Sequence, residues 1–203
     1  VDGNTFLISA PVPGEIEKRD IWMSQKKKGK WSEPVRLHIP MNPGYPSIAR
    51  NGNLYFFAID KSEHGDADIY FSRYHNQTYM PPESLGNSIN TSYHEVDPFI
   101  DPEEKYILFH RNVPGREGLH VSERRQNKAW AKARLIPGTK NAICPFVTSD
   151  RKFLFFSNNW KLKMPVTCQS YRETIKILRS AGNGFNDIYW VSADILGLDK
   201  IKK

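Results

Sequence analysis

The stretch that decides the fold is residues 54–72, LYFFAIDKSEHGDADIYFS, in which an apolar run and an alternating segment flank a polar loop. This arrangement recurs along the chain. Apolar runs begin at residues 5 (TFLI), 54 (LYFF), 106 (YILF) and 153 (FLFF), which are 49, 52 and 47 residues apart. Related segments follow them: DIWMS at 20–24, DIYFS at 68–72, GLHVS at 118–122 and DIYWVS at 187–192. Self-similarity at this period indicates an array of small units that stack to bury their apolar faces.

Each unit is predicted to contain four short strands. In the second unit we expect strands at 46–49, 54–58, 69–73 and 78–83, with a tight turn at Asn51-Gly52. In the third unit we expect them at 96–100, 106–110, 119–123 and 129–135, and in the last at 145–148, 153–157 and 188–192. Four antiparallel strands in about 45 residues have the size of a β-propeller blade. We therefore predict an all-β propeller of four-stranded antiparallel blades, with about four blades in residues 1–203.

A third repeated feature is an aromatic residue near the end of each of the first three units. These residues are Trp31, Tyr79 and Trp130. We expect them at equivalent packing positions on the fourth strands, mostly buried between blades. The aspartates that head the third strands, Asp20, Asp68 and Asp187, are expected to cap the preceding loops through hydrogen bonds to the backbone.

The units are unequal at the two ends of the chain. The first lacks its innermost strand, and the last carries an insertion at residues 158–186, in which residues 170–180 are predicted to form a short helix. Two ways of closing the ring follow. Residues 193–203 complete the first blade and close a four-bladed ring, or the domain is a fragment of a five- or six-bladed ring. We favour the larger ring.

Composition sets limits on the partners. The longest apolar runs are about five residues, far below the roughly 20 that a membrane helix needs, so no membrane span is expected. The net charge is +7 and the pI is about 9.3. The basic residues cluster in expected turns, at 26–28, 124–125 and 202–203, without the interleaved aromatics of a nucleic-acid groove. We therefore expect no nucleic-acid partner.

Metal and cofactor sites are not predicted. The two cysteines, Cys144 and Cys168, do not form a C-x-x-C pair, so a structural zinc site is not expected. A disulfide between them is one alternative if the chain is exported, and two free thiols are the other. The histidines show no metal-binding spacing, and no cofactor motif is present.

The repeated motifs resemble those of the WD-repeat-like β-propeller family found in TolB and in prolyl-oligopeptidase-type enzymes. The matching segments are WSEP at 31–34, DIY at 68–70 and 187–189, and VDPFIDP at 96–102. The resemblance covers nearly all of the chain except the insertion, and it implies a TolB-like propeller that is periplasmic or secreted. It is weak for function because the same blade serves binding scaffolds and enzyme lids. The family's glutamate three residues before the first-strand proline is matched only by Glu95.

Propellers bind ligands at one mouth of the central channel, where loops that enter the innermost strands meet loops that leave the second strands. Nine residues are candidates for that mouth: Tyr93, His94, Glu95, Asp97, His110, Arg111, Asn158, Trp160 and Arg172. Glu95 and Asp97 lie two apart on an expected strand, so we expect them to point the same way. The alternative is that both carboxylates only bond backbone amides and neighbouring blades.

Two classes of function remain open. The first is a non-catalytic scaffold that binds a protein or a glycan at the channel mouth, with the insertion covering that face. It is favoured because the sequence contains no nucleophile motif such as G-x-S-x-G. The second is a carbohydrate-active enzyme, a glycoside hydrolase or lyase, that uses Glu95 and Asp97 as its acid and base.

Overall fold

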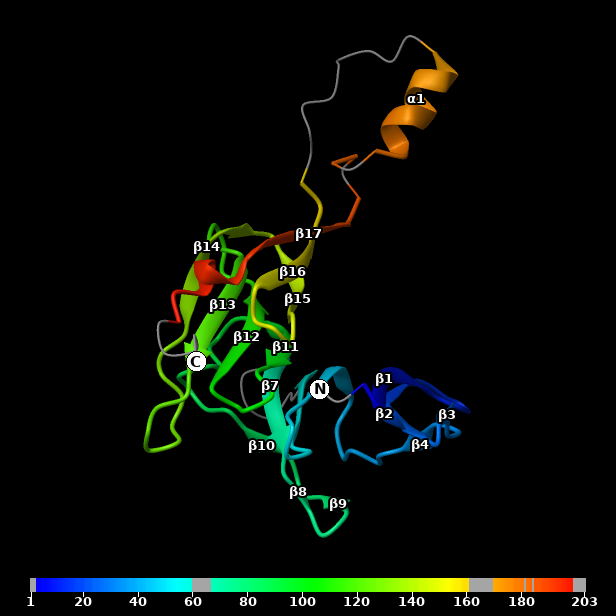
Figure 1. The fold of residues 1–203 in the computed structure, drawn as a ribbon, viewed down its shortest axis with the longest axis vertical. Helices are drawn as coiled ribbons and strands as arrows, with labels where there is room; N and C mark the ends of the chain where they lie inside the picture. The colour runs from blue at the N-terminus through cyan, green and yellow to red at the C-terminus, as the bar shows by residue number, and fades with distance from the viewer. Residues whose placement is uncertain (1–2, 60–66, 161–169, 181, 184, 199–203) are drawn as a thin grey trace.

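A computed structural model describes residues 3–59, 67–160, 170–180, 182–183 and 185–198. These residues form four antiparallel sheets in a four-blade β-propeller arrangement, as predicted (Figure 1). The apolar runs at 54–57 and 106–109 lie in successive sheets rather than in one. Contacts between strands join each sheet to the next one in chain order.

The first two sheets contain residues 5–84. The first has four strands: β1 (Thr5–Val12), β2 (Glu15–Lys27), β3 (Lys30–Trp31) and β4 (Val35–Arg36). The second has the order β10-β7-β6-β5, built from β5 (Pro43–Ile48), β6 (Leu54–Ile59), β7 (Ala67–Ser72) and β10 (Glu83–Ser84). A small separate hairpin precedes β10 and consists of β8 (Tyr74–His75) and β9 (Thr78–Tyr79).

The last two sheets contain residues 95–192. The third runs β11 (Glu95–Ile100), β12 (Tyr106–Arg111), β13 (Gly118–Glu123) and β14 (Arg134–Lys140). The fourth has three strands, β15 (Ile143–Val147), β16 (Phe153–Asn158) and β17 (Asp187–Ser192). The predicted helix of the insertion is α1 (Tyr171–Leu178), which stands apart from the sheets (Figure 1). A 3₁₀ helix, η1 (Ala193–Leu196), follows β17.

Three apolar clusters, one between each pair of neighbouring sheets, form the core. The cluster between the first and second sheets includes Ile21 and Phe56, and the next includes Tyr55 and Phe109. The cluster between the third and fourth sheets includes Leu108 and Phe156. Because side chains alternate along each strand, a central strand supplies both clusters, which explains why the second strands are apolar on both faces.

The outer strands differ from the prediction because each is split. The residues predicted as one strand at 78–83 form part of the β8–β9 hairpin and then β10, and Pro81-Pro82 separates the two pieces. Proline donates no hydrogen bond and so interrupts a ladder. In the third sheet, Trp130 forms only an isolated bridge with Arg124, and the regular strand begins at residue 134.

The repeated aromatic residues are equivalent in position but not in burial. A serine of the neighbouring strand donates to the carbonyl of the residue that follows each aromatic. The bonds run from Ser24 to Ser32, from Ser72 to Met80 and from Ser122 to Ala131, at 2.6, 2.5 and 2.6 Å. Trp130 is 9% exposed, Tyr79 is half-buried, and Trp31 is 50% exposed. The prediction that all three are mostly buried is therefore wrong for Trp31. This indole packs on Phe6, whose side of β1 faces away from the second sheet.

The aspartates that head the third strands have individual roles. Asp187 accepts a hydrogen bond from Gly182 N at 2.7 Å, so it caps the loop before it as predicted. Asp20 is buried and instead bonds Ile39 N at 3.2 Å and the Arg36 guanidinium at 2.7 Å. Asp20 therefore ties β2 to β4 and to the segment that follows β4.

The segment after β17 packs on the third sheet. The Arg134 guanidinium donates to the carbonyl oxygen of Leu196, and Leu196 is buried in the cluster between the third and fourth sheets. Residues 193–198 therefore add no strand to β1, as closure of a four-bladed ring by this segment would require. Residues 199–203 lie outside the described part of the chain.

Candidate functional site

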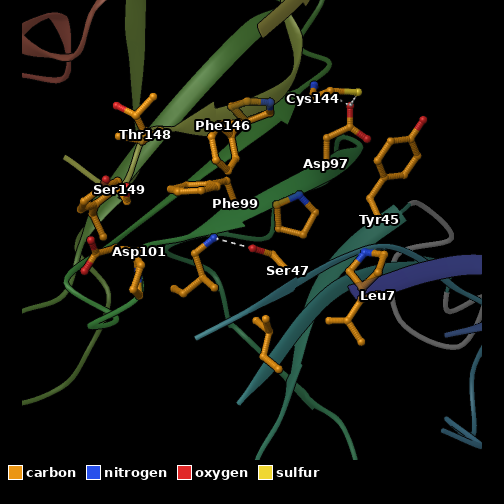
Figure 2. A pocket seen from close by; sticks show the side chains of 18 of the residues that line it. Leu7, Tyr45, Ser47, Asp97, Phe99, Asp101, Cys144, Phe146, Thr148 and Ser149 are labelled. Carbon is orange, nitrogen blue, oxygen red and sulfur yellow. Dashed lines mark hydrogen bonds between the residues drawn. The ribbon is translucent and has the colours of Figure 1, made fainter. Parts of the chain in front are cut away.

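The innermost strands enclose one large pocket of about 1920 Å³. Its walls come from β5, β11 and β15 of three consecutive blades, and β1 borders it on the side of the first blade. Figure 2 shows the polar group at one side of this pocket, made of Tyr45, Asp97 and Cys144, beside the apolar wall of Phe99 and Phe146. We call this the channel pocket.

The three polar residues occupy the same position in their blades. Tyr45, Asp97 and Cys144 each precede a proline and each have a positive φ, of 46°, 55° and 51°. At each of them the pairing of the innermost strand shifts register. A left-handed conformation costs an L-residue roughly 1–2 kcal/mol, and proline adds its own restriction on the residue before it. Such bulges redirect a side chain, here from the sheet toward the pocket.

Hydrogen bonds to the side chains of Asp97 and Ser47 link these strands across the blades. Asp97 Oδ2 accepts from Cys144 N at 3.1 Å and from Cys144 Sγ at 3.5 Å, which ties the third blade to the fourth. Ser47 Oγ accepts from Ile100 N at 3.0 Å and ties the second blade to the third. Both contacts are drawn in Figure 2. The pocket wall is therefore continuous across three blades.

The ionisable groups at the bulges influence one another. Burial raises the pKa of the Asp97 carboxyl above its usual range. Burial, and then the neighbouring Asp97 charge, raise the pKa of the Cys144 thiol to about 12. The same Asp97 charge raises the pKa of the Tyr45 phenol. Cys144 is therefore a neutral thiol near pH 7, which makes it a hydrogen-bonding group rather than a nucleophile.

Aromatic rings form much of the remaining wall. Tyr45 stacks on Phe57 with a centroid distance of 5.8 Å, and Phe146 meets Phe99 edge-on at 5.6 Å. Gly44 is required beside this stack, because a Cβ atom at that position would lie 2.5 Å from the Phe57 ring. Tyr45 and Phe146 are 53% and 54% exposed, so both rings offer free surface to a ligand.

Glu95 and Asp97 do not act as a pair. The bulge at Asp97 breaks the strict alternation of β11, so the expectation that the two side chains point the same way is wrong. Glu95 is fully buried and accepts hydrogen bonds from Arg111 Nε at 2.6 Å and from Thr91 N and Oγ1 at 2.9 and 2.6 Å. Glu95 and Arg111 thus form a structural ion pair inside the third blade.

The two candidate histidines serve neighbouring backbone groups. His94 is exposed and accepts a hydrogen bond from Ala67 N at 3.2 Å. Nδ1 of His110 lies 2.8 Å from the carbonyl oxygen of Ala142 in the connection to the fourth blade. Tyr93 is 39% exposed beside His94. Among the described residues, no three His, Cys, Asp or Glu side chains are grouped so that they could hold a metal ion.

The candidates near the insertion are not gathered at the pocket. Asn158 is buried and donates to the carbonyl oxygen of Lys140 at 2.8 Å. Trp160 packs on Phe156 and Tyr189 of the fourth blade. Arg172 is exposed on α1, away from the sheets (Figure 1). Cys168 and the rest of residues 161–169 lie outside the described residues. Of the nine candidates, Asp97 is the one that lines the channel pocket in the described part of the chain.

Sequence reasoning missed Tyr45 and Cys144, although the sequence contained a signal for them. The pairs Tyr45-Pro46, Asp97-Pro98 and Cys144-Pro145 recur at intervals of 52 and 47 residues, in step with the blades. A repeated residue before proline at the start of the innermost strand marks this set. Its positive φ, however, is not predictable from the residue types.

Comparison with solved structures identifies proteins that share this fold. No family model and no curated protein match the chain. A putative TolB from Agrobacterium tumefaciens superposes with a TM-score of 0.54 at 14% identity, over 77% of this chain and 50% of that one. The chain has the fold of TolB-type propellers. TolB from Acinetobacter baumannii gives 0.51 at 13% identity, over 82% and 37% of the two chains.

A chain from a nidogen/laminin complex is a third solved neighbour, with a TM-score of 0.51 at 13% identity over 76% of this chain and 53% of that one. The chain thus spans about half, or less, of the length of these neighbours. At these identities the likeness establishes the propeller fold. In addition, no helix among the described residues is long and apolar enough to cross a membrane.

Proposed function

We propose that this chain is a non-catalytic binding scaffold that holds an extended segment of a protein partner in the channel pocket. The size of the pocket carries this proposal. Its volume of about 1920 Å³ exceeds the range of about 300–1,000 Å³ that is usual for small-molecule sites. A pocket of this volume with aromatic walls and a few fixed polar groups suits a polypeptide or an oligosaccharide.

A protein partner is the first choice for the ligand. The exposed faces of Tyr45 and Phe146 are of the kind that anchors protein interfaces, and polar groups surround them. One structural neighbour comes from a nidogen/laminin complex, and this likeness supports a protein partner. A glycan is the second choice, since sugars also stack on exposed aromatic rings.

The enzyme alternative is not favoured by the geometry. It needs two carboxylates that face a common substrate, but Glu95 is held by Arg111 and Thr91 inside the blade.

The pocket also lacks the charge of a nucleic-acid groove. Three of the basic residues that line it, Arg50, Arg151 and Lys152, form ion pairs with Glu103, Asp101 and Asp150.

The resemblance to TolB supports a location outside the cytoplasm, in the periplasm or secreted.

Selection from a random peptide display library against the purified protein tests the proposal, with a glycan array as the parallel arm. Enriched peptides should shift the amide NMR signals of the non-proline residues that flank the bulges: Tyr45, Ser47, Asp97, Phe99, Cys144 and Phe146. Shifts confined to the outer strands would contradict the pocket as the site. Glycan binding without any peptide binding would replace the protein partner by an oligosaccharide.

A further inference from the structure

We propose that Asp97 is an anchor for a cationic group of the bound partner, a lysine ammonium or an arginine guanidinium, which enters the channel pocket beside Tyr45. This inference rests on the proposed function and specifies which chemistry the partner presents.

One oxygen of the Asp97 carboxylate accepts hydrogen bonds from the described residues, and the other accepts none. Both hydrogen bonds that Asp97 accepts, from Cys144 N and Cys144 Sγ, end on Oδ2. Within the described residues Oδ1 accepts none, although the residue is only 7% exposed and lines the pocket. A carboxylate this buried is normally paired or fully hydrogen-bonded. The half-satisfied carboxylate therefore has the capacity for one more donor, and that donor must come through the pocket.

Among the described residues, no lysine, arginine or histidine forms an ion pair with Asp97. Two other carboxylates of the pocket lining differ in this respect: Asp101 pairs with Arg151 at 3.0 Å, and Asp150 pairs with Lys152 at 3.8 Å. The Arg19 guanidinium also borders the pocket, but its hydrogen bonds go to Ser9. Burial raises the pKa of Asp97 by more than the hydrogen bonds from Cys144 and the nearby charge of His110 lower it, so these neighbours do not offset the loss of water.

The surroundings of Asp97 suit an alkylammonium or a guanidinium. The half-exposed ring of Tyr45 lies on the preceding blade, close enough for the Asp97 charge to raise the pKa of its phenol. An aromatic face beside a carboxylate holds a cation by charge and by cation–π attraction together. Phe99 and Phe146 can cover the aliphatic part of the side chain that carries the charge.

A purely structural role explains less. The bond from Cys144 N to Oδ2 ties two blades together, but an asparagine side chain would accept that bond equally well. It needs neither a negative charge nor an oxygen turned toward the pocket. The variant Asp97→Asn therefore separates the two roles, because it preserves the acceptor for Cys144 N and removes the charge. Asp150→Asn is the matched control, since it removes one carboxylate charge from the same pocket at an exposed position.

The test uses two fluorescein-labelled nonapeptide libraries of Gly, Ser, Leu and Tyr, one with a single lysine and the other with norleucine in its place. We expect the wild-type protein to bind the lysine library about tenfold more tightly, as a charge-assisted hydrogen bond would give. Asp97→Asn should bind both libraries with the norleucine affinity, and Asp150→Asn should keep the preference. Equal affinities on the wild type, or a preference that survives in Asp97→Asn, would overturn the proposal.

The two proposals fail in different ways. Binding of both libraries without a lysine preference removes the cation anchor and leaves the scaffold function intact, whereas binding of neither library contradicts the scaffold function and the anchor with it. If Asp97→Asn does not fold, competition on the wild type decides. n-Butylammonium should displace the lysine peptides at concentrations at which n-butanol does not, and equal displacement by both compounds would overturn the anchor.

Discussion

Arg111 Nε donates to Glu95 Oε1 at 2.6 Å, and this ion pair joins β12 to β11 inside the third blade, where Glu95 is fully buried. Removing one partner of a buried pair leaves the other as an uncompensated charge. We expect Arg111→Met to lower the free energy of unfolding by about 3–5 kcal/mol in urea denaturation. The exposed pair Lys18–Glu15 provides the control, and Lys18→Met should cost less than about 1 kcal/mol. Equal losses in the two variants would show that the buried pair has no special role.

The hydrogen bond from a strand serine, Ser24, Ser72 or Ser122, to the carbonyl after the outer aromatic is repeated in three blades. The Ser122 hydroxyl, buried in the third sheet, donates to the carbonyl oxygen of Ala131 at 2.6 Å. Ser122→Ala leaves that carbonyl without this donor, so we expect a loss of about 1–3 kcal/mol in the same assay. The exposed Ser92 is the matched control, and Ser92→Ala should change stability by less than about 0.5 kcal/mol. A neutral Ser122→Ala would mean that water replaces the hydroxyl.

Trp130 and Trp31 provide a test of how blades bury their outer aromatics. Trp130 belongs to the cluster between the second and third sheets, whereas Trp31 is half exposed on the first. Trp130→Ala should cost about 3–5 kcal/mol, as for other buried large aromatics. Trp31→Ala should lower the free energy of unfolding by less than about 1.5 kcal/mol, because a half-exposed side chain loses less buried surface and leaves no closed cavity. Melting temperatures that fall equally for the two variants would contradict this assignment.

His120 should make the stability of the protein depend on pH. Burial lowers the pKa of His120 from its ordinary value of 6.5 to about 4. As the pH falls below 6.5 the unfolded chain takes up a proton that the folded protein does not bind until about pH 4. Folding should therefore lose about 1–3 kcal/mol across this interval. His120→Phe should lack this part of the pH dependence. If the difference in free energy of unfolding between wild type and variant does not change between pH 6.5 and 4, the assignment to His120 is wrong.

The fold was predictable because its signals are local and repeated. The apolar second strands and the third strands ending in serine recur with the blade, so four independent stretches supported one interpretation. The burial of the outer aromatics was not predictable in the same way. Trp31 and Trp130 have equivalent positions, but the side chain is buried only where another blade packs against it. That partner is distant in sequence, and a period of about 50 residues does not reveal which faces are covered.

The site was predicted only in part. Asp97 was identified through its place at the entry to an innermost strand, and it does line the pocket. Glu95, two residues earlier, is held inside the blade because the bulge interrupts the alternation from which a shared direction was inferred. Tyr45 and Cys144 join Asp97 only through the packing of three blades, although their prolines recur in the sequence. Charge pairing and side-chain direction depend on these contacts and are not encoded in residue type.

The most direct test of the account compares one substitution at two exposed apolar positions, using a peptide selected from the display library. Phe146 is 54% exposed and lines the channel pocket, whereas Ile188 is 80% exposed on β17 and lies outside the pocket lining. We predict that Phe146→Asp raises the dissociation constant of the peptide at least about 30-fold, the scale of a binding hot spot, and that Ile188→Asp leaves it unchanged. Unchanged affinity in Phe146→Asp, or an equal loss in both variants, would contradict the channel pocket as the binding site.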